Sequence, residues 1–205
     1  MRRSANKTNF FRESAHFDFL TDVVFPRLAA SAHEIRIWST ACANGEEPDT
    51  MAIVVRDKFP VEAQRRTRIL ATAISTRVLT TARAARYRGR QLHGLSPEVL
   101  RKHLDRQPGD CEAWTVKREV RDMVKFARLN LMEAWPMRGL FDVILCRNVM
   151  IYFDRESQAR LVDRFAALLP PGGILCVGHT ESLSDFAPEL EQLQPAVYRK
   201  PDAAS

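Results

Sequence analysis

Residues 40–48, "TACANGEEP", combine small side chains with two carboxylates, Glu46 and Glu47. The small residues, which would let the backbone approach a ligand closely, are Ala41, Cys42, Ala43 and Gly45. Adjacent carboxylates disfavour a phosphate, which binds where positive charge gathers at the start of a helix. They suit a cationic ligand, such as the amine and sulfonium of S-adenosylmethionine. An equal alternative is that both glutamates only complement the dipole of the following helix.

Polar residues also follow two other apolar runs. Asn130 and Leu131 stand at the end of one run. The other run is followed by Arg147, Asn148 and Tyr152. Ligands of open parallel sheets bind beyond the carboxyl ends of the strands, where such side chains meet. Any one of them could be a satisfied polar group of the core, but together they predict a binding site.

Short apolar runs alternate with helical patterns along the chain. Strands are expected at 34–41, 68–74, 124–130, 141–148, 172–179 and 196–200. Helices are expected at 46–59, at 75–87 with Ser75 as its cap, and near 155–169. This alternation predicts an α/β fold with a mainly parallel sheet that helices cover on both faces.

The segment 88–122 breaks this alternation. "LSPEVLRKHL" predicts a helix capped by Ser96 with Pro97 at its first position, and "QPGD" predicts a turn. The pieces "AWTVK" and "REVRDMV" favour strands. We interpret 88–122 as a small inserted subdomain within one main domain, residues 1–205; a long decorated crossover is the alternative.

The composition restricts the class of protein. With 205 residues, 45% of them hydrophobic, the chain can bury one substantial core but hardly two full-sized domains. A formal net charge of +6 suits an acidic partner. The start "MRRSANKTNFFRE" has no apolar region after it, and no stretch approaches the roughly 20 apolar residues of a membrane span. We therefore expect a soluble chain without membrane insertion.

The four cysteines are far apart and form no CxxC pair, which argues against a zinc site and against a dense disulfide framework. Cys42, Cys146 and Cys176 lie in apolar runs, as small core residues do. This pattern favours a reducing, cytoplasmic setting.

Six segments resemble the successive motifs of one protein family. They are "NKTNFFRE", "WSTACANGEEP", "NLMEAWP", "FDVILCRNVMIYFD", "LLPPGGILCVGHTESL" and the closing "YRK". In this order they are similar to the CheR family, the S-adenosylmethionine-dependent methyltransferases that esterify glutamates on bacterial chemoreceptors in chemotaxis adaptation. The likeness covers nearly the whole chain. It implies a Rossmann-like class I S-adenosylmethionine methyltransferase sheet with a small inserted β-subdomain.

The resemblance also implies roles for single residues. Arg12 and Tyr152 match the pair that lines the point of methyl transfer, and Glu47 matches the residue facing the methionine part of the cofactor. Asn130 and Leu131 match contacts around the adenine. The full set of implied cofactor contacts is Asn6, Thr8, Arg12, Ala41, Glu47, Ala73, Asn130, Leu131, Arg147 and Asn148. No metal is implied.

The chemistry of methyl transfer to a glutamate makes modest demands on the protein. A carboxylate with a pKa of about 4.3 is already ionised at neutral pH, so no general base is required. Arg12 could hold the incoming carboxylate by paired hydrogen bonds and Tyr152 could orient it. As alternatives, Arg12 could pair with Glu13, and Tyr152 could be a core aromatic residue.

A basic segment bears on the partner. Residues 75–91 contain five arginines and no acid, and the spacing of Arg83, Arg86 and Arg90 predicts one shared helix face. A solvated face is the ordinary explanation. The resemblance implies instead that this face meets the acidic methylation helices of a chemoreceptor. We expect a monomer, and no nucleic-acid partner, because no "DPPY"-like or aromatic-interleaved basic motif is present.

Three departures from the family pattern stand out. In "LATAIST", Ala73 replaces the aspartate that holds the ribose hydroxyls. Asp49 replaces an aromatic residue and would add negative charge beside the site. The chain also opens almost at "NKTNFFRE", so the helical N-terminal domain typical of the family is not expected here. These departures leave open a catalytically impaired, methyltransferase-like docking module in chemotaxis-type signalling.

Overall fold

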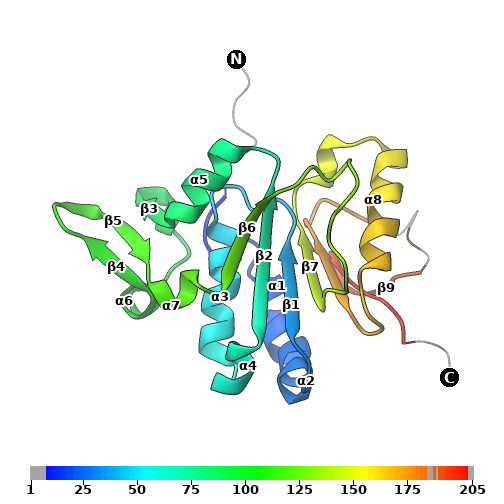
Figure 1. The fold of residues 1–205 in the computed structure, drawn as a ribbon, viewed down its shortest axis with the longest axis horizontal. Helices are drawn as coiled ribbons and strands as arrows, with labels where there is room; N and C mark the ends of the chain where they lie inside the picture. The colour runs from blue at the N-terminus through cyan, green and yellow to red at the C-terminus, as the bar shows by residue number, and fades with distance from the viewer. Residues whose placement is uncertain (1–7, 184–186, 188, 203–205) are drawn as a thin grey trace.

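A seven-stranded sheet forms the centre of the molecule (Figure 1), which is described by a computed structural model for residues 8–183, 187 and 189–202. The strand order is β6-β2-β1-β7-β8-β10-β9. In chain order the strands are β1 (Ile35–Ser39), β2 (Thr67–Ala73), β6 (Val124–Arg128), β7 (Val143–Cys146), β8 (Ile174–Val177), β9 (Glu191–Gln194) and β10 (Val197–Arg199). β10 is antiparallel to both of its neighbours, whereas β1, β2, β6, β7 and β8 pair in parallel.

The chain reverses its direction of sheet growth beside β1. After β1 it adds β2 and β6 on one side, and then returns to add β7 on the other side. β1 and β7 pair with Trp38 opposite Ile144. In an open α/β sheet such a switch point leaves a crevice beyond the carboxyl ends of the strands.

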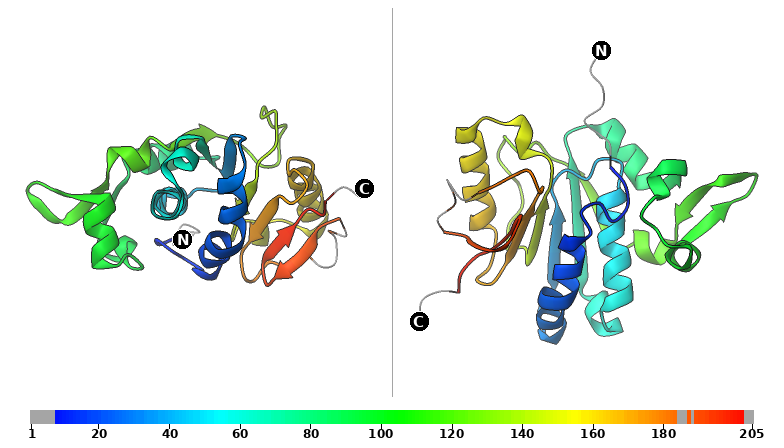
Figure 2. Two further views of the ribbon diagram at one scale, coloured as in Figure 1. Left: turned by 90° about the horizontal axis from the view of Figure 1, so that it is seen from below. Right: turned by 180° about the vertical axis from the view of Figure 1, so that it is seen from behind.

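Helices cover both faces of this sheet (Figure 2). They are α1 (Ala15–Phe19), the π-helix η1 (Leu20–Val24), α2 (Phe25–Ala30), α3 (Glu46–Lys58), α4 (Val61–Arg65), α5 (Thr76–Ala84), α6 (Pro97–His103), α7 (Arg118–Arg121) and α8 (Arg155–Ala167), with the short 3-10 turns η2 (Gly89–Leu92) and η3 (Met150–Tyr152). Ile35 and Ile37 of β1 pack with α1, α2 and α3, whereas Trp38 packs with α8. This alternation places one hydrophobic core on each side of the sheet.

The strands predicted for the central sheet and the long helices are present, with the expected caps, although the helix predicted at 75–87 ends at Ala84 and is followed by β3. The hydroxyl of Ser75 accepts a hydrogen bond from the Val78 amide, and that of Ser96 accepts one from the Val99 amide. The sequence prediction missed β9 and assigned the first residue of β4 (Leu104–Gln107) to a helix. Within the described residues, no helix is long and apolar enough to cross a membrane.

The segment "REVRDMV" was predicted as a strand, and this prediction is wrong. Its first four residues form α7, and β6 begins at Val124. Val120 and Met123 are three residues apart, which is helical spacing, and Val120 is fully buried. The apolar period therefore favoured a helical turn over the local strand propensity.

A second, three-stranded antiparallel sheet projects to one side of the central sheet (Figure 1). Its order is β3 (Arg86–Arg88), β5 (Asp110–Val116) and β4. The side chain of Tyr87 in β3 is buried and connects this sheet to α3, because its hydroxyl donates a 2.6 Å hydrogen bond to Asp49. Whether 88–122 behaves as a subdomain stays a prediction; the small sheet itself begins at Arg86.

Candidate functional site

A cavity of about 420 Å³ lies at the switch point, beyond the carboxyl ends of β1, β2, β6 and β7. Its size falls in the range of small-molecule sites, roughly 300 to 1,000 Å³. The loops after these four strands line it, together with the N-terminal segment and the first turns of α3 and α5. The predicted site residues that it brings together are Thr8, Arg12, Ala41, Glu47, Ala73, Asn130, Leu131, Arg147, Asn148 and Tyr152. Asn6 was also predicted here and lies outside the described residues.

Arg147 occupies the floor of this cavity. Only 2% of its side chain is exposed, so its charge needs partners. Its guanidinium lies 3.1 Å from Oε2 of Glu47 and 3.3 Å from Oε2 of Glu13, and it also donates to the carbonyl of Arg12. The Ser39 hydroxyl donates to the second oxygen of Glu47 at 2.7 Å. Burial raises the pKa of Glu47, and Arg147 opposes this effect.

Asn148 connects the N-terminal segment to the loop after β7. Its Nδ2 donates to Oε1 of Glu13 at 3.1 Å, and its Oδ1 accepts from Arg12 at 2.8 Å. Its backbone amide donates to Oε2 of Glu181 at 2.9 Å. Burial would raise the pKa of Glu13, but the bond from Asn148 and the charge of Arg147 hold this pKa below its usual value.

The backbone around the cavity is strained. Phe11 (φ 53°), Glu13 (φ 54°), Ala43 (φ 43°) and Asn148 (φ 58°) are non-glycine residues in the left-handed region. Such a conformation costs on the order of 1 to 3 kcal/mol and persists where surrounding contacts hold it. Four strained residues in the three segments around one cavity indicate that the cavity is a functional site.

The comparisons with known proteins agree with this geometry. The family described as CheR methyltransferase, SAM binding domain, matches residues 6–198. The chain belongs to the CheR methyltransferase family. A probable chemotaxis protein methyltransferase of Rhizobium etli is 40% identical over 188 residues, which cover 90% of this chain and 70% of that protein.

Two further relatives named chemotaxis protein methyltransferase are similar to this chain. The Borreliella burgdorferi protein is 39% identical over 96% of this chain and 71% of its own length. The Salmonella typhimurium protein is 39% identical over 95% of this chain and 67% of its own length. Among solved structures, the N-methyltransferase NodS of Bradyrhizobium japonicum, in complex with S-adenosyl-L-homocysteine, aligns with a TM-score of 0.52 over 98% of this chain and 94% of its own, at 15% identity. This likeness shows a shared class I methyltransferase fold.

The CheR pocket of this chain suits S-adenosylmethionine in charge and shape. Glu13 and Glu47 place two carboxylates beside Arg147 at the floor, and such groups attract a cationic amine or sulfonium. Ala41 and Ala43 leave room for the ligand beside the backbone. Burial raises the pKa of the Cys42 thiol to about 12, so this lining residue stays protonated.

Ala73 lies at the end of β2, where the resemblance to the family led us to expect an aspartate. No described lining residue supplies a replacement acid, since Glu47 is the one carboxylate among them. Ser75 lines the cavity, but its hydroxyl caps α5. The structure therefore places no acidic group where the ribose hydroxyls are expected.

Tyr152 lies at the mouth of the cavity with 62% of its surface exposed, so it is not a core aromatic residue. Arg12 is 4.0 Å from Glu13, a long ion pair that coexists with the shorter bond to Asn148. The alternative pairing of Arg12 with Glu13 is therefore present, alongside a position at the pocket, and the roles of Arg12 and Tyr152 in methyl transfer stay a prediction.

Two acids were expected beside the ligand and are not there. Glu46 is fully buried and points away from the cavity, with Oε1 accepting from Gln91 at 2.8 Å. Asp49 was expected to add charge beside the site, but it is 1% exposed and faces Tyr87. Burial raises the pKa of Asp49 to about 7, and the neighbouring Glu46 adds to this effect. Burial also raises the pKa of Glu46.

The predicted arginine face on one helix is also wrong. α5 ends at Ala84, because Ala85 adopts a left-handed conformation with φ 48°. Arg83 is therefore on α5, whereas Arg86 is in β3 and Arg90 is in η2. Arg83 donates to the carbonyl of Phe126, and Arg86 lies 3.6 Å from Asp110. The three arginines are exposed but lie on three different elements.

Two acids that hold the loops around the cavity were not singled out from the sequence. The sequence reasoning named Glu13 only as a possible partner of Arg12 and did not single out Glu181. Both lie inside quoted motifs, "NKTNFFRE" and "LLPPGGILCVGHTESL", which was the available signal. Glu181 also accepts from the amides of Ile151 and Gly178, at 3.2 and 2.6 Å.

Proposed function

We propose that this chain is an S-adenosylmethionine-dependent O-methyltransferase that esterifies glutamate side chains of bacterial chemoreceptors. The observation that supports the proposal is the cavity at the switch point, where ten residues at positions of the family motifs meet. Family membership supports the same activity.

Different residues of the cavity would contact different parts of the cofactor. Glu47 and Arg147 would face its methionine part, Asn130 and Leu131 its adenine, and Thr8 and Ala41 complete the walls. When bound, the cofactor supplies an electrophilic methyl group on a sulfonium. Asn148 fixes Arg12 at the edge of this space through their 2.8 Å hydrogen bond.

The protein's own contribution is alignment and exclusion of water. The substrate carboxylate is ionised at neutral pH and needs no base. Arg12 would bind that carboxylate by charge-assisted hydrogen bonds, and the exposed Tyr152 would orient it at the mouth. Opposite charges cancel as the methyl moves, so a dry site favours the reaction.

The surface that would bind the chemoreceptor is inferred from its positive charge. The acidic methylation helices of a chemoreceptor would meet the basic surface formed by α5, β3 and η2, which carries Arg83, Arg86 and Arg90. We further infer that 88–122 acts as an inserted subdomain on that side, and that the chain works as a monomer. The cytoplasm is the proposed setting, because all four cysteines are free and three are buried.

Calorimetric titration with S-adenosylhomocysteine tests the proposal. We expect the chain to bind it, and Ala73→Asp to bind about 5- to 150-fold more tightly, because one restored buried hydrogen-bond partner contributes about 1 to 3 kcal/mol. Ala84→Asp is the matched control: it adds the same charge at the exposed end of α5, outside the cavity, and should leave the affinity unchanged.

The absent acid at Ala73 favours a second candidate, a docking module without turnover. If Ala73→Asp binds S-adenosylhomocysteine and the parent chain does not, the docking module is supported. The pocket would then keep its shape but lack one contact that binding requires. If neither protein binds S-adenosylhomocysteine, the cofactor assignment is wrong. Binding by the chain itself, followed by methylation of a receptor fragment, supports the enzyme.

A further inference from the structure

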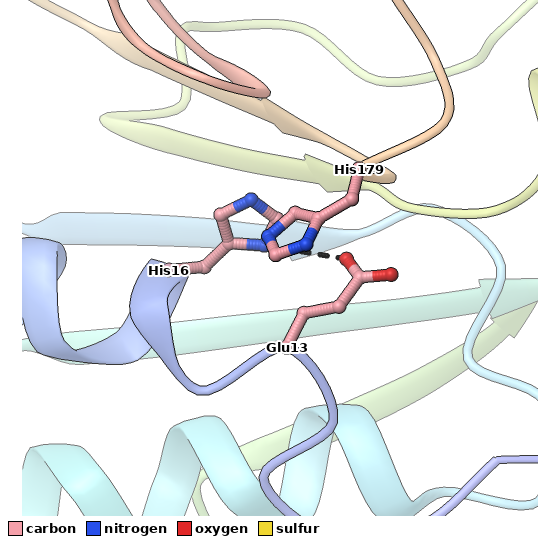
Figure 3. A group of neighbouring side chains, drawn as sticks. All are labelled: Glu13, His16 and His179. Atoms are coloured by element: carbon pink, nitrogen blue, oxygen red, sulfur yellow. Dashed lines mark ion pairs between the residues drawn. The ribbon is translucent and has the colours of Figure 1, made fainter.

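Glu13, His16 and His179 gather beneath the pocket floor (Figure 3). Glu13 lies in the turn before α1, His16 lies in α1, and His179 lies in the loop after β8. One possible ligand atom from each residue lies within 4.8 Å of the other two. Figure 3 shows the two imidazole rings against each other and close to the carboxylate; their centroids are 5.0 Å apart.

His16 is the unusual member of this group. It is 1% exposed, yet neither of its ring nitrogens has a hydrogen-bond partner among the residues that the structure describes. Nδ1 lies 3.7 Å from Oε2 of Glu13, which is too long for a hydrogen bond. Buried polar atoms in folded proteins nearly always have a partner, so a buried imidazole without one indicates a missing ligand.

The surroundings of Glu13 resemble those of a metal-binding carboxylate. Asn148 donates to its Oε1 and Arg147 to its Oε2. Carboxylates that bind metals are commonly held by such outer hydrogen bonds, which fix their orientation. Arg147 also repels a cation, so the site would be weaker than a closed structural zinc site.

We propose that Glu13, His16 and His179 bind one divalent first-row transition ion of the Zn²⁺ type. Two imidazoles and one carboxylate are ligands that Zn²⁺ accepts, and three protein ligands leave a fourth position for water. Ligands at about 2.1 Å in a tetrahedron lie about 3.4 Å apart, so atoms that now lie up to 4.8 Å apart must approach one another by as much as about 1.4 Å. His179 is exposed and can make that movement, and it leaves the ion a route from solvent.

Occupancy of this site is coupled to the pocket. Glu13 is shared between the proposed ion and the pocket residues Arg147 and Asn148. A bound dication would coordinate the Glu13 carboxylate, partly neutralise its charge, and add positive charge near the floor of the pocket. Zn²⁺ therefore weakens the binding of the cationic S-adenosylmethionine, by about fivefold or more. This coupling rests on the proposed cofactor; ion binding itself does not.

The test is titration of the untagged chain with Zn²⁺ by calorimetry and with Co²⁺ by visible absorption, without cofactor or substrate. We expect one ion per chain, and a loss of at least tenfold in affinity in His179→Ala. His179 is exposed, so this variant keeps its fold; His16→Gln is the second variant. His33→Ala, an exposed histidine 3.0 Å from Asp142, and Cys111→Ser are the controls and should bind as the parent does.

Absence of Zn²⁺ binding to the parent chain would overturn the proposal, as would equal affinity in His179→Ala and the parent. Loss of binding in Cys111→Ser or His33→Ala would place the ion elsewhere and also overturn it. Because the titration uses no cofactor, these results stand apart from the S-adenosylhomocysteine titration. Failure of one proposal can therefore be told from failure of the other.

Discussion

Glu46 and Glu47 are adjacent in the first turn of α3, yet they belong to two different clusters. The pocket cluster consists of Glu13, Glu47 and Arg147, where a buried guanidinium pairs with both carboxylates. The subdomain cluster consists of Glu46, Asp49, Tyr87 and Gln91, where the carboxyls accept hydrogen bonds from neutral side chains.

The acids of the two clusters differ in their partners and in the direction of their pKa shifts. In the pocket cluster burial would raise the pKa of Glu13, but the hydrogen bond from Asn148 and the charge of Arg147 together lower it. In the subdomain cluster Glu46 Oε2 and Asp49 Oδ1 have no hydrogen-bond partner, and the pKa of Asp49 rises to about 7. The surroundings therefore favour the charged form of Glu13 in the pocket cluster and the neutral form of Asp49 where α3 joins the small sheet. Glu47 is intermediate between these cases, because burial raises its pKa while Arg147 lowers it.

Removing the cation should have the largest effect. Arg147→Met removes the shared cation from two largely buried carboxylates, so we expect the free energy of unfolding to fall by about 3 to 5 kcal/mol, together with loss of S-adenosylhomocysteine binding. Urea denaturation at pH 7 measures the change. Arg160→Met is the control, because Arg160 pairs with Glu156 on the surface and its loss costs less than about 1 kcal/mol. Similar losses in both variants would contradict the comparison.

The second prediction concerns pH. The folded pKa of Asp49, about 7, lies above its unfolded value of about 3.8, so the native state binds more protons between these values. Stability contributed by this group is present below pH 4 and is lost as pH rises towards 7. Asp49→Asn should therefore be more stable than the parent at pH 8, by about 1 to 3 kcal/mol, and lose most of this advantage at pH 5.

Urea denaturation of the parent and Asp49→Asn at both pH values decides this point. Asp122→Asn serves as the control, since Asp122 is exposed and pairs with Arg118 on the surface. A stability difference that does not change with pH would show that Asp49 is ionised throughout, and the contrast between the clusters would disappear.

The smallest effect is expected at Gln91. Gln91→Leu removes the hydrogen bond to Glu46 and should cost about 1 kcal/mol at pH 8. At pH 5 the cost should be smaller, because the pKa of Glu46 is already raised and the neutral acid needs the donor less. Affinity for S-adenosylhomocysteine should not change, as Gln91 does not line the cavity. A change in that affinity would mean that the two clusters communicate.

The sheet and its ligand edge could be predicted because they depend on local patterns. Apolar runs and the polar residues that follow them placed Asn130, Arg147 and Asn148 at one edge. The directions of Glu46 and Glu47 depend on how α3 starts after Gly45, whose φ is 104°. Adding a Cβ there would bring it within 2.5 Å of the Tyr87 hydroxyl, so the start of α3 is fixed by a residue of the small sheet. No local pattern contains that contact.

The arginine face failed for a related reason. The spacing of Arg83, Arg86 and Arg90 is helical, but the buried Tyr87 and the pairing of Arg86 with Thr115 draw the chain into β3. Tertiary contacts thus ended the helix where its local sequence would have allowed it to continue. Glu13 and Glu181 were missed because their importance depends on partners more than 30 residues away, such as Asn148.

Glu181 has a consequence for how the pocket can move. One carboxylate accepts the amides of Asn148 and Ile151 after β7 and of Gly178 after β8. A side chain at Gly178 would bring Cβ within 2.8 Å of that carboxylate, which keeps the position closed to larger residues. Neither loop can lift without breaking bonds that also hold the other. The two loops therefore open as a single cooperative unit, and local unfolding at this wall of the cavity is a collective event.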